Sequence, residues 1–82
     1  MKIRTKDLKE RMVFAGSKSP NVHNEIVRIY KGDINGKTKT LVETEQYGAT
    51  LENQNHNKRV IMIATEITRV LNNRMAHIVL AR

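Results

Sequence analysis

The sequence predicts an α+β fold: a small single domain over residues 1–82 in α-β-β-α-β order, with a three-stranded antiparallel-type sheet packed on one amphipathic helix. Two patterns support this prediction. Residues 25–46 hold two β-branched runs around an Asn-Gly pair, which is typical of a β-hairpin. Residues 58–72 repeat apolar side chains at the spacing of one helix face. A chain of this length buries only about 60–65% of its unfolded surface, so we do not expect a deep, enclosed active site.

The long helix is predicted from a helical wheel of residues 58–72. One contiguous face of that wheel contains the apolar side chains of Val60, Ile61, Ile63, Ala64, Ile67, Val70 and Leu71. Its β-branched residues lower the helix propensity, and a strand over Val60–Ile63 is the alternative. Because the stretch from Lys58 to Asn73 spans sixteen residues, more than a usual strand, we predict a helix.

The register of the hairpin follows from its turn. Asn35 and Gly36 can supply the two positive φ angles of a type I′ turn, so Ile34 is expected to pair with Lys37. Counting away from the turn gives the pairs Ile29–Val42 and Val27–Thr44 on the side facing the helix. On the other side the pairs are Tyr30–Leu41, Arg28–Glu43 and Ile26–Glu45. We expect the second of these to be a cross-strand ion pair on a partly solvated face.

Four further segments complete the predicted fold. A short helix is expected at 5–13, and a flexible loop at 16–24, where Gly, Ser, Pro and Asn interrupt both periodicities. Residues 47–57 are polar and are expected to form a connecting loop. Residues 74–82 fit either a second short helix or a closing strand buried on both faces, and their continuous apolar run favours a strand over 74–81.

The charge of the chain is strongly positive. Fifteen Lys and Arg against eight Asp and Glu give a net charge of +7. Residues 1–40 carry ten basic and four acidic side chains, residues 41–57 carry only three acids, and residues 58–82 carry five basic side chains and one acid. This uneven distribution predicts one surface that attracts a polyanion. We therefore expect a small non-enzymatic protein that contacts nucleic acid, DNA or RNA, mainly through backbone phosphates.

The candidate nucleic-acid contacts fall in three groups: the N-terminal segment, the hairpin near its turn, and the start of the predicted long helix. They are Lys2, Arg4, Lys6, Lys9, Arg11, Lys31, Lys37, Lys39, Lys58 and Arg59. Cations at a helix amino terminus oppose the helix dipole, so the last pair breaks a local rule, as functional residues often do. The first two groups also fit a simpler interpretation, in which they are the solvated side of a surface helix and a charged hairpin tip.

Other chemistry finds little support in the sequence. The absence of cysteine excludes disulfides, thiolate catalysis and Cys-based zinc sites. His23, His56 and His77 occur in no metal-binding spacing, and His77 is expected to be a hydrogen-bonded core residue. We therefore expect no catalytic residues, no metal and no cofactor. One Phe and two Tyr offer few surfaces on which bases could stack, which favours backbone contacts over base contacts.

The alternative function is a small protein-docking factor that acts on a host or viral protein. Inhibitors, adaptors and assembly proteins encoded by phages and mobile elements have this size and charge, which is an analogy only. An open sheet edge also predicts self-association, with a homodimer as the simplest form. No run reaches the roughly 20 apolar residues that span a bilayer, and the first twelve residues lack the apolar region of a signal peptide. The expected location is the cytoplasm of the cell or of a host cell, without a membrane partner.

Overall fold

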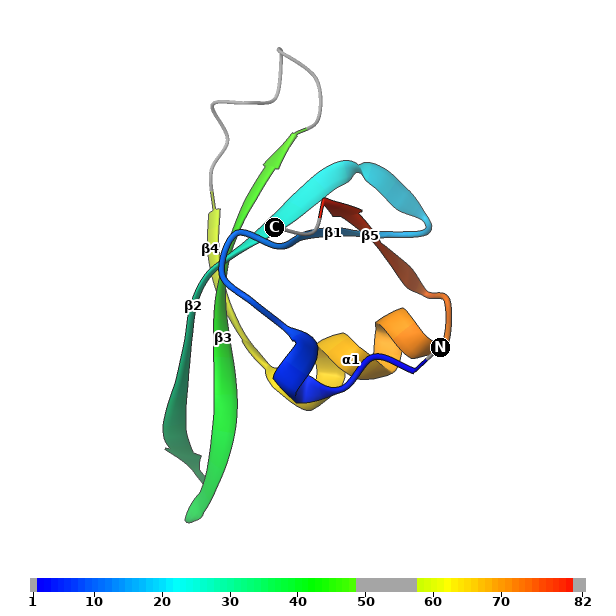
Figure 1. The fold of residues 1–82 in the computed structure, drawn as a ribbon. Helices are drawn as coiled ribbons and strands as arrows, with labels where there is room; N and C mark the ends of the chain where they lie inside the picture. The colour runs from blue at the N-terminus through cyan, green and yellow to red at the C-terminus, as the bar shows by residue number, and fades with distance from the viewer. Residues whose placement is uncertain (1, 49–57, 81–82) are drawn as a thin grey trace.

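The computed structural model describes residues 2–48 and 58–80, which form a short 3-10 helix, five strands and one α-helix (Figure 1). In chain order these are η1 (Thr5–Asp7), β1 (Val13–Gly16), β2 (Ser19–Ile34), β3 (Lys37–Gly48), β4 (Lys58–Ile63), α1 (Ala64–Asn72) and β5 (Ala76–Leu80). The predicted α+β class is confirmed. The predicted three-stranded sheet and the α-β-β-α-β order are wrong, because two more strands, β1 and β4, join the sheet.

The five strands form a single sheet in the order β4-β3-β2-β1-β5, and every neighbouring pair is antiparallel. The sheet is strongly curved, and the tip of the β2–β3 hairpin projects beyond the rest of the molecule (Figure 1). Helix α1 joins the two edge strands β4 and β5, and it contacts both of them as well as β3 and η1. The edges of the sheet are therefore connected through one short helix.

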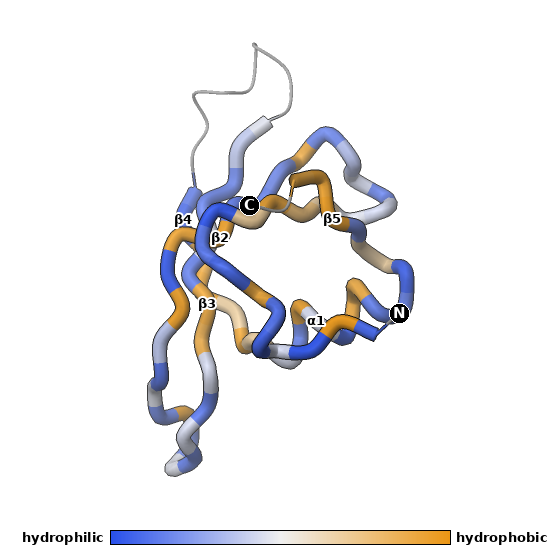
Figure 2. Tube along the Cα trace, viewed as in Figure 1, coloured by the Kyte–Doolittle hydropathy of each residue, from blue (hydrophilic) through white to orange (hydrophobic). Residues whose placement is uncertain are grey.

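The core lies between the curved sheet and α1. Its fully buried side chains include Ile26 and Val42 from the sheet and Ala64 and Ile67 from the helix. Buried helix positions at 64, 67, 68 and 71 recur at the spacing of one helix face and form a stripe, and Figure 2 shows hydrophobic residues recurring along α1 between hydrophilic ones. The burial of that stripe, rather than any side-chain cap, fixes the helix against the sheet, because its N-cap residue Ile63 has no capping side chain.

The predicted hairpin turn and the register next to it are confirmed. Asn35 and Gly36 have φ angles of 52° and 79°, and Ile34 pairs with Lys37. The pairs Tyr30–Leu41, Ile29–Val42 and Arg28–Glu43 also lie opposite each other as predicted. The expected ion pair is present, with 3.4 Å between Arg28 Nη2 and Glu43 Oε1.

Beyond Arg28 the predicted register is wrong, because a β-bulge at Val27 shifts it by one residue. Ile26 pairs with Thr44 rather than with Glu45. A regular strand would place Ile26 on the solvated face beside Arg28, because side chains alternate. The bulge instead brings Ile26 into the core, where both Ile26 and Thr44 are fully buried.

The predicted helix over 58–72 is correct only from Ala64 onward. Residues Lys58–Ile63 form the edge strand β4, which pairs with β3 through contacts such as Leu41–Ile63 and Thr44–Val60. The β-branched residues that lowered the helix propensity here are well suited to a strand. Helix α1 ends at a Schellman-type turn, in which Arg74 takes a φ of 60° and Met75 N–H donates to the Val70 carbonyl.

The predicted N-terminal helix over 5–13 is also wrong: only the single turn η1 forms there. Arg11 has a φ of 73°, and its N–H donates to the Ile26 carbonyl at 2.7 Å. This left-handed residue ends any helical continuation and directs the chain into β1. Leu8 and Met12, on either side of this turn of the chain, are both buried.

The remaining segments differ from prediction in extent and in burial. In place of the predicted flexible loop 16–24, the chain makes a turn at Ser17 and Lys18 and enters β2. Tyr47 and Gly48, the first two residues of the predicted loop 47–57, belong to β3, and the rest of that prediction lies outside the described residues. The closing strand is confirmed as β5, but it pairs with β1 and most of it is exposed rather than buried.

Candidate nucleic-acid interface

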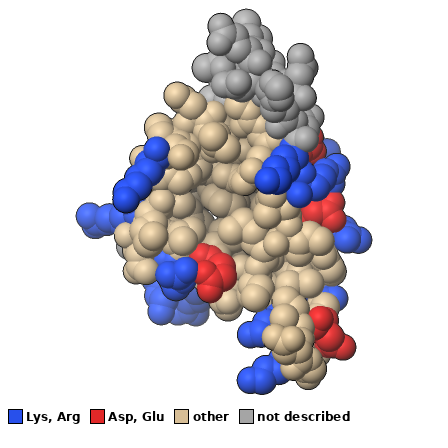
Figure 3. All heavy atoms as spheres, turned by 180° about the vertical axis from the view of Figure 1, so that it is seen from behind, with Lys and Arg blue, Asp and Glu red and all other residues tan. Residues whose placement is uncertain are grey.

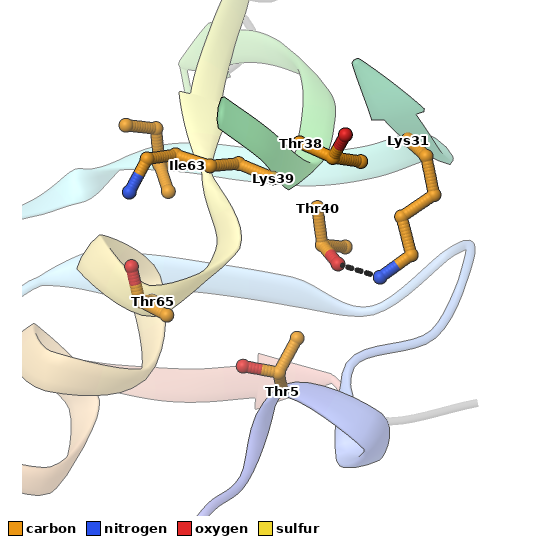
Figure 4. Close-up of a pocket in the computed structure, with 7 residues that line it drawn as sticks. All are labelled: Thr5, Lys31, Thr38, Lys39, Thr40, Ile63 and Thr65. Carbon is orange, nitrogen blue, oxygen red and sulfur yellow. Dashed lines mark hydrogen bonds between the residues drawn. The ribbon is translucent and has the colours of Figure 1, made fainter. Parts of the chain in front are cut away.

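A groove of about 400 Å³ lies between η1, the outer half of the hairpin and the start of α1. It is lined by Thr5, Lys31, Thr38, Lys39, Thr40, Ile63 and Thr65 (Figure 4). Thr5, Thr40 and Thr65 point toward a shared space, into which the ammonium group of Lys31 also extends (Figure 4). Among the described residues that line the groove, none is acidic.

Lys31 is held in this position by the hairpin register. It lies opposite Thr40, and its Nζ donates a hydrogen bond of 2.7 Å to Thr40 Oγ1. Ile29 packs against the core. Lys31 is two residues further along the strand, so its side chain projects from the same face, just beyond the end of the core. Further out on the same face of the hairpin, Asp33 accepts a 2.9 Å hydrogen bond from Thr38 Oγ1. Lys31 therefore keeps donors that an incoming anion can use.

Lys39 and Lys37 lie on the other side of the hairpin. Lys39 pairs with Gly32, and its side chain extends along Ile63, away from the ammonium group of Lys31 (Figure 4). Its stem borders the groove while its charge lies at the rim. Lys37 is exposed at the turn. The three hairpin lysines are therefore distributed around the outer half of the hairpin and do not converge on one point.

The N-terminal candidates are spread along α1. Thr5 lines the groove, and its chain neighbours Arg4 and Lys6 are exposed but do not line it. At the far end of α1, Asn72 holds Ile3 by two hydrogen bonds of 2.8 Å, accepting from its N–H and donating to its carbonyl. Lys2 therefore lies near the end of the helix, roughly 13 Å from its start. The structure does not bring the N-terminal candidates together with the hairpin lysines as one patch; only Arg4 and Lys6 flank a residue that lines the groove.

Lys9 and Arg11 are exposed between η1 and β1, and neither lines the groove.

Lys58 and Arg59 lie on β4, apart from the N-terminal and hairpin candidates. They open β4 instead of a helix, so the argument from the helix dipole is wrong. Arg59 forms ion pairs with Glu43 and, at 3.5 Å, with Glu45. Four residues of extended strand, roughly 13 Å, separate Arg59 from the groove residue Ile63.

Lysines and arginines differ in how their charges are compensated. All four ion pairs among the described residues involve arginine, namely Arg28, Arg59 and Arg69. None of the eight lysines forms an ion pair with a carboxylate of a described residue. On the face seen in Figure 3, basic side chains lie at the margins in separate groups and leave the centre uncharged. The positive surplus is therefore carried mainly by uncompensated lysines, but it is not concentrated on that face.

Two features of the groove and the hairpin were not predicted from the sequence. The groove threonines were not singled out, although Thr38 and Thr40 alternate along β3 on the same side as Lys31. The guanidinium of Arg28 lies 4.2 Å from the ring centroid of Tyr30, which engages one of the few aromatic rings in a cation–π contact.

The described histidines do not form a metal site. His23 packs edge-to-face on Tyr47, with ring centroids 5.6 Å apart. His77 was predicted to be a core residue, and this is wrong, because it is exposed on β5. His56 lies outside the described residues. In residues 2–48 and 58–80, no three His, Asp or Glu side chains are grouped so that they can hold a metal ion.

Comparisons with protein-family models, with curated proteins and with solved structures found no match. Within the described parts of the chain, no helix has the length and hydrophobicity needed to cross a membrane.

Proposed function

We propose that this protein binds nucleic acid through backbone phosphates, and that the groove between η1, the hairpin and α1 is the central contact. The observation that carries this proposal is the convergence of the Lys31 ammonium group with the side chains of Thr5, Thr40 and Thr65 in an open groove. Ammonium and hydroxyl groups are typical donors to phosphate oxygens. The absence of an acid among the described lining residues favours an anionic ligand.

The surroundings of the groove extend the same chemistry. Lys39 lines the groove, and the exposed side chains of Arg4, Lys6 and Lys37 belong to the chain segments that border it, so they are available for further phosphates. Helix α1 begins at the groove without a side-chain cap, although Glu66 in its first turn offsets part of the positive end of the helix dipole. Flexible lysines recognise charge rather than base sequence, so we propose binding with little sequence preference.

Lys58 and Arg59 are not part of the site proposed here. The charge of Arg59 is offset by Glu43 and Glu45, and both residues lie along β4 away from the groove. Backbone contact is favoured over base stacking because Tyr30 is engaged by Arg28 and Tyr47 by His23. These contacts leave few rings for bases.

The test is a fluorescence titration of random duplex DNA and RNA at two salt concentrations. The double variant Lys31→Gln/Lys39→Gln removes two charges at the groove, and Lys18→Gln/Lys58→Gln removes two charges elsewhere as a matched control. We expect the groove variant to bind about tenfold more weakly or worse, and its salt slope on duplex DNA to fall by up to about 1.8, because each phosphate contact contributes about 0.9. The control should stay near the original affinity.

Two outcomes would contradict the proposal. Equal weakening in both variants would mean that net charge alone, and not the groove, attracts the nucleic acid. Absence of binding at low salt would exclude nucleic acid as the ligand and favour the alternative, docking on another protein.

A further inference from the structure

The second edge of the sheet, strand β5, exposes an apolar surface that the proposed function does not use. In the described residues β5 pairs only with β1, so the N–H and C=O groups along its other edge have no partner strand. Its side chains Ile78, Val79 and Leu80 are 37–41% exposed, and Met75 just before it is 57% exposed. We call these four residues the β5 edge. Such an edge is a template for pairing with another strand.

Most protections that proteins give to edge strands are absent from β5. Ala76–Leu80 contains no Lys, no acid and no Pro, whereas the opposite edge strand β4 begins with Lys58 and Arg59. The one protective feature is a bulge: Phe14 pairs with Ile78 and Val13 with Leu80, which leaves Val79 as the extra residue. A bulge shortens the stretch that can pair but does not cover the exposed side chains.

Charge indicates what kind of partner fits the β5 edge. An acidic partner would be attracted to the uncompensated lysines elsewhere, because β5 itself contains no Lys or Arg. Two copies of a chain with a net charge of +7 repel each other, so they can approach closely only where neither copy presents Lys or Arg. Of the two edge strands, only β5 meets that condition. An antiparallel pair also places Arg74, which precedes β5, at opposite ends of the contact in the two copies.

We propose that the β5 edge binds the β5 edge of a second copy of this chain, antiparallel about a two-fold axis, so that two five-stranded sheets continue into one. The same residues contact each other in both copies, as in an isologous dimer. The N–H and C=O groups of each strand then pair, and the four exposed apolar side chains leave water. A five-residue strand interrupted by a bulge gives a small interface, below about 1,200 Å² in total, so the dimer is weak and reversible.

The test compares two substitutions that add one lysine to each edge strand. Val79→Lys places a charge on β5, and Ile61→Lys, at a side chain that is 58% exposed, places the same charge on β4. Sedimentation equilibrium without nucleic acid, over a micromolar to millimolar series, should show a monomer–dimer equilibrium for the original chain and for Ile61→Lys. For Val79→Lys the dissociation constant should rise by at least about tenfold, because two like charges then meet at the interface.

A second measurement needs no substitution. Hydrogen exchange of the original chain at low and high protein concentration should show protection that increases with concentration at residues 76–80 and not in β4. A monomer at every concentration would overturn the proposal, as would a dimer lost in Ile61→Lys but kept in Val79→Lys. Binding of a foreign apolar strand to β5 by a chain that stays monomeric would likewise exclude the second copy as the partner. Because no nucleic acid is present, failure here is independent of the groove.

Discussion

The two edge strands of the sheet, β4 and β5, have similar apolar sequences but different surfaces. Helix α1 connects them, yet β4 starts with two cations and β5 contains no Lys, Arg, Asp or Glu. On β4, Arg59 reaches Glu43 and Glu45, and Glu43 also accepts from Arg28 on β2, so an ionic cluster crosses three strands at that edge. Cations that count equally in the sequence therefore differ in their surroundings. Arg59 is paired with two acids at a sheet edge, while Lys31 forms no ion pair with a described residue.

The largest effect on stability is expected from a substitution in α1, the helix that contacts both edge strands. Ile67 is fully buried on α1, which contacts both β4 and β5. Ile67→Ala should lower the free energy of unfolding by about 2–4 kcal/mol, because it leaves a cavity between the helix and the sheet. Urea denaturation measures the loss, and hydrogen exchange should show that both edges lose protection together. Thr65→Ala, at an exposed position of the same helix, should change stability by less than about 0.5 kcal/mol.

If Ile67→Ala exposed β5 to exchange and left β4 protected, the two edges would open independently and would not belong to one cooperative unit.

A smaller change should act on one edge alone. Thr44 is fully buried on β3, and its hydroxyl donates to the Val60 carbonyl of β4 at 3.1 Å. Thr44→Val keeps the shape and removes that donor, so we expect a loss of about 1 kcal/mol, with faster exchange in β4 and unchanged exchange in β5. Thr68→Val is the matched control, because Thr68 donates within α1, to the Thr65 carbonyl. Equal acceleration in both edges would mean that the hydroxyl does not act locally.

The hairpin was predictable from sequence because its turn chemistry is local. Asn35-Gly36 fixes the pair Ile34–Lys37, and alternation carries the register to Arg28 and Glu43. The error begins at Val27, where two adjacent apolar residues compete for one inward position. Alternation alone gives that position to Val27, and only the tertiary core, which takes Ile26, decides for a bulge.

The edge strand β4 was missed for a related reason. The positions of Val60, Ile61 and Ile63 satisfy a helix face, but the same residues also fit a strand paired with β3, which half-buries Val60 and Ile63 and leaves Ile61 exposed, so the pattern is ambiguous. The junction between Ile63 and Ala64 has no Gly, Pro or polar cap to mark it. The strand forms because β3 offers a partner, which is information from elsewhere in the chain.

The candidate site was predictable in part. Composition identified the lysines, and the hairpin turn placed Lys31, Lys37 and Lys39 near each other. Neither indicates that Thr5 and Thr65, sixty residues apart, line one groove, since that depends on how α1 and η1 pack. The pairing of β4 with β3 places Lys58 and Arg59 away from the groove.

The smallest effect on stability, and the sharpest test of the comparison, comes from making β4 resemble β5. Lys58→Gln/Arg59→Gln removes both charges from the β4 edge and should lower the free energy of unfolding by at most about 1 kcal/mol, because the Arg59 side chain is 60% exposed and its ion pairs are screened by water. In a Val79→Lys background, where pairing through β5 is blocked, we expect the uncharged β4 to begin to self-associate. Sedimentation equilibrium measures this. Lys6→Gln/Lys9→Gln in the same background lowers the net charge equally without touching an edge, and it should stay monomeric. If both double variants associate alike, total charge rather than charge at the edge keeps β4 apart from its copies.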